Sequence, residues 1–112
     1  MTPAEIRERV ASLSSDEVNR EIATRRDAWT LSHAPLGQSE KVVPCDFCGS
    51  WALAGPLLEE LLRLGISVES YREPWAIFID LDEVLGSCKL NFAHEPAEAF
   101  SRVWLIANWE RP

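Results

Sequence analysis

Hydrophobic residues near the start of the chain recur at helical spacing. Ile6 and Val10 stand four residues apart behind Pro3, which suits the first turn of a helix. Ser14 precedes Glu17 by three residues, the spacing of a capping box, and a second helix is expected to follow. The second helix is a thin amphipathic one that needs to dock on the rest of the protein to be stable. The two predicted helices cover residues 3–12 and 14–28.

Residues 51–64 carry the clearest helical pattern in the chain. Their apolar stripe consists of leucines at spacings of four, four and three, widened by two more: Leu53, Leu57, Leu61, Leu64, Leu58 and Leu62. Pro56 must lie in the first turn of this helix or kink it. Gly65 is a natural stop after the last turn.

The next segments alternate apolar and polar residues, which predicts strands. Residues 66–71 and 75–81 are close enough along the chain to form an antiparallel hairpin, and residues 88–92 can add a short third strand. Pro96 then opens a final helix. Its apolar positions are Phe100, Val103, Trp104 and Ala107.

These elements predict an α+β fold in a single domain over residues 1–112. The core is an α-β-β-α sandwich over residues 51–109, in which two helices cover a small antiparallel sheet of two or three strands. Residues 1–29 add one or two N-terminal helices. Residues 30–50, rich in turn-forming residues, are expected to be a long loop.

The charge balance narrows the range of partners. The chain has 112 residues and a net charge of −7. Residues 1–29 hold five basic and six acidic groups, whereas residues 30–112 hold six basic and twelve acidic groups. Because phosphate backbones repel an acidic body, direct nucleic-acid binding is disfavoured. A basic partner protein or mimicry of nucleic acid fits this charge.

No apolar run reaches the roughly 18 residues that a membrane span needs, and the first residues lack the apolar core of a signal peptide. We therefore expect a cytoplasmic protein. An odd count of three cysteines favours reduced thiols over disulfides.

The order of elements resembles a known family. The resembling segments are residues 13–23, which match an N-terminal helix, Trp29, residues 44–51 leading into Leu57–Leu61, the hairpin from Gly65 to Ile79, and residues 96–105. Together they resemble the phage ABA-sandwich domain, found in small phage and prophage proteins of largely unknown function. The resemblance covers about residues 13–109 and rests on order and spacing. Residues 3–12 and the pair Cys45 and Cys48 depart from the pattern. The resemblance implies a phage-borne accessory protein, and it implies no established chemistry.

Two cysteines stand at the spacing of a zinc knuckle or a redox pair, Cys45 and Cys48. A structural zinc site needs four ligands, and Cys88 with His94 could complete one, with His33 as a further candidate. The second pair of candidate ligands lacks the close spacing of a zinc knuckle, because Cys88 and His94 are six residues apart. We favour small thiols packed beside Phe47, with no metal or other cofactor.

Two enzyme hypotheses remain open beside a non-enzymatic protein. Asp80 and Asp82, with Glu83 next to them, could hold magnesium for a hydrolase, although we favour an acidic, solvated strand end as their explanation. Ser87 with Cys88 and His94 includes a nucleophile and a base, but no spacing sets a catalytic triad.

The five tryptophans are the most unusual feature of the composition. Trp51, Trp104 and Trp75 fall on apolar stripes, which predicts that they lie in the core. Trp29 and Trp109 lie near element ends, where they either pin the chain or form an exposed interface. A nucleobase could stack on such rings while a cation holds its phosphate. The candidate binding residues are Trp29, Trp51, Tyr71, Arg72, Trp75, Lys89, Arg102 and Trp109.

The leading hypothesis is a non-enzymatic accessory protein that counters a host defence by binding a host protein through its acidic surface. The alternative is an oligomeric sponge for a nucleotide-like signalling molecule, held in a pocket between subunits. Free sheet edges favour a homodimer or a higher homo-oligomer in either case.

Overall fold

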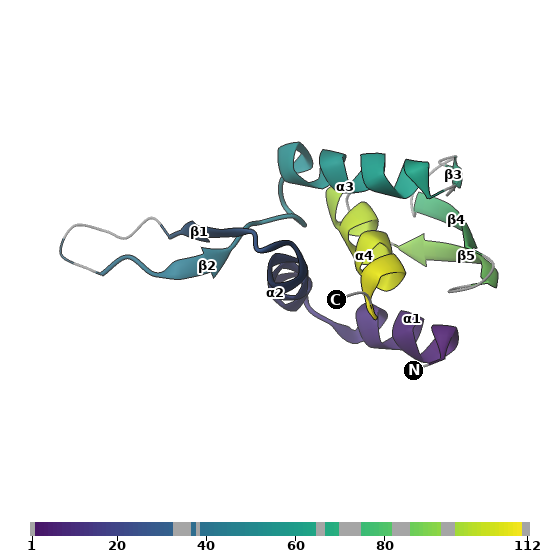
Figure 1. Cartoon of the computed structure of the whole chain (residues 1–112), viewed down its shortest axis with the longest axis horizontal. Coiled ribbons are helices and arrows are strands. Elements are labelled where there is room, and N and C mark those ends of the chain that lie inside the picture. The colour runs from purple at the N-terminus through teal and green to yellow at the C-terminus, as the bar shows by residue number, and fades with distance from the viewer. Residues whose placement is uncertain are drawn as a thin grey trace.

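The structure, a computed structural model, describes residues 2–32, 37, 39–64, 67–69, 75–81, 86–92 and 96–110; for Pro3 and for residues 67–92 it describes the backbone only. This part of the chain forms four helices and two antiparallel sheets (Figure 1). The elements are α1 (Pro3–Ser12), α2 (Ser15–Arg26), β1 (Trp29–Leu31), β2 (Val42–Pro44), α3 (Trp51–Arg63), β3 (Ser67–Glu69), β4 (Trp75–Leu81), β5 (Gly86–Phe92) and α4 (Pro96–Asn108). The predicted α+β class is confirmed.

Capping boxes begin both N-terminal helices. The Thr2 hydroxyl accepts from the Glu5 N–H at 3.2 Å, and the Ser14 hydroxyl accepts from the Glu17 N–H at 3.2 Å. Each glutamate accepts in return from the N–H of its capping residue, so two otherwise unpaired donors are satisfied at each helix start. These hydrogen bonds hold the pKa of both glutamates below the usual range. The capping box predicted for Ser14 is confirmed.

Helix α4 is the centre of the core. Every residue from Ala99 to Ala107 is buried, and α1, α2 and α3 each pack against this helix (Figure 1). The first helix contributes Ile6 and Val10, and the third contributes Leu57 and Leu61. A helix that is apolar on nearly all sides can be stable in water only when other elements surround it.

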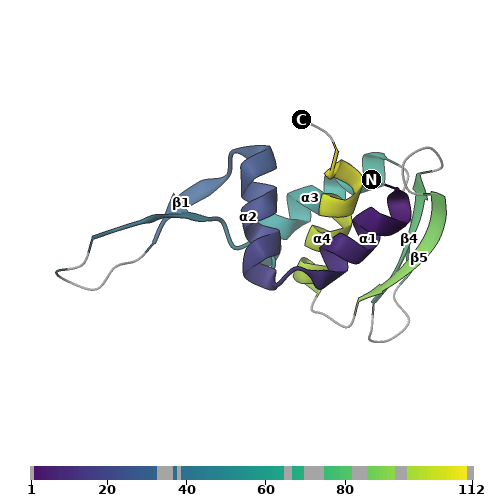
Figure 2. The ribbon, with the colours of Figure 1, turned by 90° about the horizontal axis from the view of Figure 1, so that it is seen from below.

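The three-stranded sheet has the order β3-β4-β5, with antiparallel neighbours throughout. Figure 2 shows α1, α3 and α4 on the same side of this sheet. The predicted helix-strand-strand-helix core is therefore present, with the third strand included.

Two details of the sequence prediction are corrected. Residues 30–50 are not loop throughout, because Trp29–Leu31 pairs with Val42–Pro44 at the two ends of that segment. Pro56 lies inside α3, beyond its first turn. It has no N–H for the carbonyl of Ala52 and is accommodated within the helix. Gly65, the predicted stop, lies outside the described residues.

None of the helices in the described ranges combines the length and the apolar character that crossing a membrane requires.

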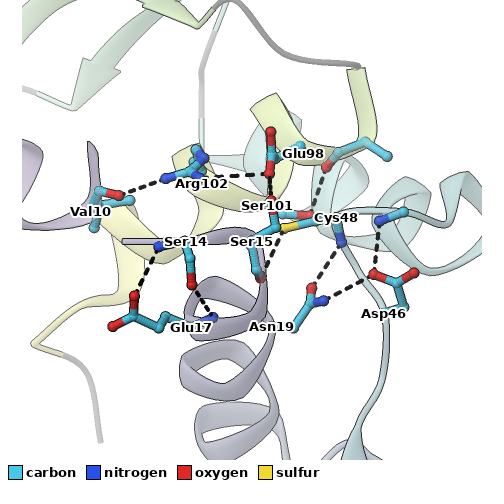
Figure 3. Close-up of polar contacts among 12 residues, drawn as sticks. Val10, Ser14, Ser15, Glu17, Asn19, Asp46, Cys48, Glu98, Ser101 and Arg102 are labelled. Atoms are coloured by element: carbon cyan, nitrogen blue, oxygen red, sulfur yellow. Dashed lines mark hydrogen bonds and ion pairs between the residues drawn. The ribbon is translucent and has the colours of Figure 1, made fainter. Parts of the chain in front are cut away.

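Arg102 is buried at the centre of α4 and connects it to α1. Its guanidinium donates to the carbonyl oxygen of Val10 at 2.8 Å and lies 3.6 Å from the Glu98 carboxylate (Figure 3). Val10 is in the last turn of α1, and its carbonyl also accepts from the N–H of the C-cap residue Leu13 at 3.2 Å. The side chain predicted to bind a ligand therefore joins two helices inside the core.

We expect Arg102→Met to lower the free energy of unfolding by about 3–5 kcal/mol, because it leaves the largely enclosed Glu98 carboxylate, 12% exposed, without its cation. Urea denaturation followed by circular dichroism measures this change. Arg63→Met is the matched control: Arg63 forms the same i,i+4 pair with Glu59, but on an exposed surface. Its effect should stay within about 0.5 kcal/mol. Equal losses of unfolding free energy in the two variants would show that the buried contacts of Arg102 stabilise the fold no more than an exposed ion pair does.

Candidate functional site

A two-stranded arm projects from the helical body, visible in both views (Figures 1 and 2). We call β1 and β2 together the β-arm. They pair antiparallel, with Trp29 opposite Pro44 and Leu31 opposite Val42. The pairing continues beyond both strands, because the Ser32 N–H donates to the Lys41 carbonyl at 2.8 Å.

One face of the β-arm is apolar and open to solvent. Directly opposed residues of an antiparallel pair share a face, and so do residues two apart on one strand. Trp29, Leu31, Val42 and Pro44 therefore lie on the same face. Leu31 is 58% exposed, Val42 is 66% exposed and Trp29 is 37% exposed. Large apolar side chains gathered on a projecting element are typical of interaction surfaces.

The end of α2 directs the chain into the β-arm. Asp27 ends the helix with φ 53°, in the left-handed region. Aspartate tolerates this conformation better than most residues other than glycine. Next to it, the Cys45 N–H donates to the Ala28 carbonyl at 3.2 Å, so the two strands of the arm meet at its base.

Two shallow grooves adjoin at the base of the β-arm. One has a volume of about 360 Å³ and is lined by Asp16, Asn19, Arg20, Val43, Pro44 and Asp46. The other has a volume of about 280 Å³ and shares Asp16, Asn19 and Asp46, adding Ser15, Cys48, Gly49 and Glu98. Glu98 is engaged by the Ser15 hydroxyl and by Arg102. The exposed carboxylates of Asp16 and Asp46 outnumber the one guanidinium of Arg20, so the grooves favour a cation.

The segment between the two predicted zinc-knuckle cysteines is tied to α2 by a buried asparagine (Figure 3). Asn19 donates to Asp46 Oδ1 at 2.9 Å and accepts from the Cys48 N–H at 2.9 Å. Asp46 Oδ1 also accepts from the Gly49 N–H at 3.0 Å. A Cβ at Gly49 would lie 2.9 Å from Asp46 Cγ, which explains the glycine. The turn is fixed by these hydrogen bonds and by the burial of Phe47.

Cys48 has the environment of an unreactive thiol. Burial, helped by the nearby Glu98 carboxylate, raises its pKa from 9.0 to about 12. Its Sγ donates to the Ser15 carbonyl at 3.7 Å. Redox cysteines instead have lowered pKa values. The geometry of Cys48 thus fits the packed-thiol interpretation.

A zinc site is not assembled in the described part of the chain, where no three candidate ligands come together. Cys45 and Cys48 are both free thiols. The side chain of Cys88 is not among those described, and His33 and His94 lie outside the described residues. The zinc hypothesis therefore remains a prediction.

The predicted aromatic and basic residues do not form one site among the side chains described. Trp29 lies on the β-arm. Trp51, expected in the core, is 52% exposed at the start of α3, where its ring lies 5.7 Å from that of Phe100. Trp104 is buried, as predicted. Tyr71 and Arg72 lie outside the described residues, and the side chains of Trp75 and Lys89 are not described.

Two of the indole rings are covered by arginines of this chain. The Arg25 guanidinium lies 4.7 Å from the centroid of the Trp109 ring and donates to the Trp109 carbonyl at 3.0 Å. Arg26 lies 5.5 Å from the centroid of the Trp104 ring. These contacts favour the interpretation of Trp109 as a residue that pins the C-terminal segment to α2.

The predicted catalytic groups fall in the three-stranded sheet and its connections. Asp80 is on β4, and Ser87 and Cys88 are on β5, paired opposite Asp80 and Ile79 respectively. Their side chains are not described. Asp82, Glu83 and His94 lie outside the described residues, so the enzyme hypotheses remain predictions.

Sequence reasoning missed Leu31, Val42 and the β-arm itself. The available signal was weak: Thr30, Val42 and Val43 are β-branched, and they flank a turn-rich segment. Each strand has only three residues, too few for alternation to be distinguished from loop.

No protein-family model, curated protein or solved structure matches this chain.

The raised pKa of Cys48 predicts a specific labelling result. The test uses a chain with Cys45→Ser and Cys88→Ser, so that Cys48 is its one thiol. At pH 8, iodoacetamide should alkylate Cys48 about a thousandfold more slowly in the native chain than in the urea-unfolded chain, because the thiolate fraction is smaller by that factor. Because folding raises the pKa of Cys48, the protonated thiol favours the folded state. Its contribution to the free energy of unfolding is fully present below pH 9 and is lost as the pH rises toward 12.

The matched control retains Cys45 alone, a half-buried thiol, and should react faster in the native state. Native Cys48 that reacted as fast as the unfolded chain would contradict the packed-thiol interpretation.

Proposed function

We propose that this chain is a non-enzymatic binding protein that captures a partner protein through the apolar face of the β-arm. The exposure of Leu31 and Val42 on this face carries the proposal. Leaving these side chains in water forgoes roughly 1.5–3 kcal/mol each, which their burial against a partner would recover.

The charges beside the arm indicate the chemistry of the partner. Asp16 and Asp46 line the grooves at its base against the single cation of Arg20. The whole chain carries a net charge of −7. A complementary partner therefore presents an apolar cleft bordered by lysines or arginines, and its approach is accelerated by electrostatic attraction.

The biological setting that we propose is that of a phage or prophage accessory protein acting on a host protein used in defence. The resemblance of residues 13–109 to the phage ABA-sandwich domain supports this setting. The β-arm supports the mode of action, since a projecting apolar element fits a protein surface better than a small molecule.

The nucleotide-sponge alternative has less support. Both grooves at the base of the arm contain exposed carboxylates, which repel phosphate groups. The rings of Trp104 and Trp109 already face arginines of this chain.

Site-specific photo-crosslinking tests the proposal. A benzophenone amino acid at position 31 should capture a basic bacterial protein in cells that produce the chain. The control position is Leu62 on α3, which is 53% exposed and thus comparable in accessibility to Leu31. Capture from position 62 should be absent or unspecific.

The captured protein is then purified and titrated against variants of the chain. Leu31→Ser with Val42→Ser should weaken binding about tenfold or more, whereas Leu62→Ser should leave it unchanged. Raised salt should slow association. Equal losses in both variants, or capture from position 31 of nothing except a second copy of the chain, would overturn the proposal.

A further inference from the structure

The hydrogen bonds at the two ends of the β-arm determine which of its backbone groups point outward. The bonds from Ser32 to Lys41 and from Cys45 to Ala28 place these two opposed pairs among the hydrogen-bonded pairs of the ladder. In an antiparallel ladder such pairs alternate with pairs whose N–H and C=O groups point away. Trp29 and Leu31 on β1 therefore direct their backbone groups to the outer edge.

The two edges of the β-arm differ in their ability to pair. The outward positions of β2 are Val42 and Pro44, and proline has no N–H. A proline at this position makes the edge less able to pair with another strand, because one donor is missing. The edge of β1 keeps both donors and both acceptors, and no described strand pairs with it. The open edge of the arm is thus that of β1.

We propose that this edge pairs with β1 of a second copy of the chain, antiparallel about a two-fold axis at Thr30. Trp29 of one copy then lies opposite Leu31 of the other, and each pair exchanges two hydrogen bonds. The result is a four-stranded sheet in the order β2-β1-β1-β2. This interaction goes beyond the proposed function and does not rest on it.

Three features of the arm favour a second copy as the occupant. A two-stranded ribbon is marginal in water, whereas three or more strands with an apolar face are stable. The two-fold pairing places the apolar faces of both arms side by side, so the exposed leucines and tryptophans become neighbours across the interface. The blunted β2 edges are left outermost, so the assembly closes at two copies and does not extend into a fibre.

Proline substitutions on the two edges test the inference. Leu31→Pro removes an outward donor from β1, and Val42→Pro makes the same change on β2; neither removes a donor of the β1-β2 ladder. Sedimentation equilibrium of the full chain should give twice 12.6 kDa for the wild type and for Val42→Pro. Leu31→Pro should raise the dimer dissociation constant about tenfold or more.

Hydrogen exchange of the wild type gives a readout that needs no substitution. The amides of Trp29 and Leu31 should become protected as the protein concentration rises, while the Val42 amide stays unprotected. Raised salt should strengthen the dimer, because each copy carries a net charge of −7. A complex with a basic partner should respond to salt in the opposite direction.

A wild-type chain that stays monomeric at every concentration would overturn the inference. So would equal loss of the dimer in both proline variants, or protection of the Val42 amide instead of the Leu31 amide. A dimer without capture of another protein from position 31 would support this inference and contradict the proposed function, so the two can fail separately.

Discussion

The burial of helix α4 is the constraint on which the rest of the structure depends. Nine consecutive residues, from Ala99 to Ala107, are inaccessible to water, so three other helices have to surround this one. Even its central cation is enclosed: the Arg102 guanidinium lies against Glu98 and donates to the carbonyl of the buried Val10 in α1. On the described helical body, the exposed large apolar side chains are Trp51 and Leu62, near opposite ends of α3.

The recognition surface that we propose is the β-arm, the element that the core does not use. The β-arm leaves the body at Asp27 and returns at Cys45, where the turn of residues 45–49 is tied to Asn19. This rigid base holds an arm whose apolar side chains face solvent. The same base lines grooves with the carboxylates of Asp16 and Asp46, so in the proposed complex apolar and electrostatic attraction would act side by side.

The helices could be predicted from the sequence because their signals are local. Ser14 and Glu17 define a capping box within one turn, and the leucines of α3 repeat over about three turns. The β-arm could not be predicted, because its three-residue strands pair across ten or more intervening positions. The roles of Arg102 and Asn19 were hidden for a related reason. An arginine that joins α4 to Val10, 92 residues away, looks in sequence like any solvent-facing cation.

The central claim is that the β-arm carries recognition and the helical body carries stability. Its most direct test is the sedimentation behaviour of a chain in which a short glycine-serine linker replaces residues 29–44. Ala28 and Cys45 are already joined by a 3.2 Å hydrogen bond, so a short linker can close the gap. The account predicts a folded monomer that neither dimerises nor binds the protein captured from position 31. A folded chain that still associates, or a body that unfolds without its arm, would contradict it.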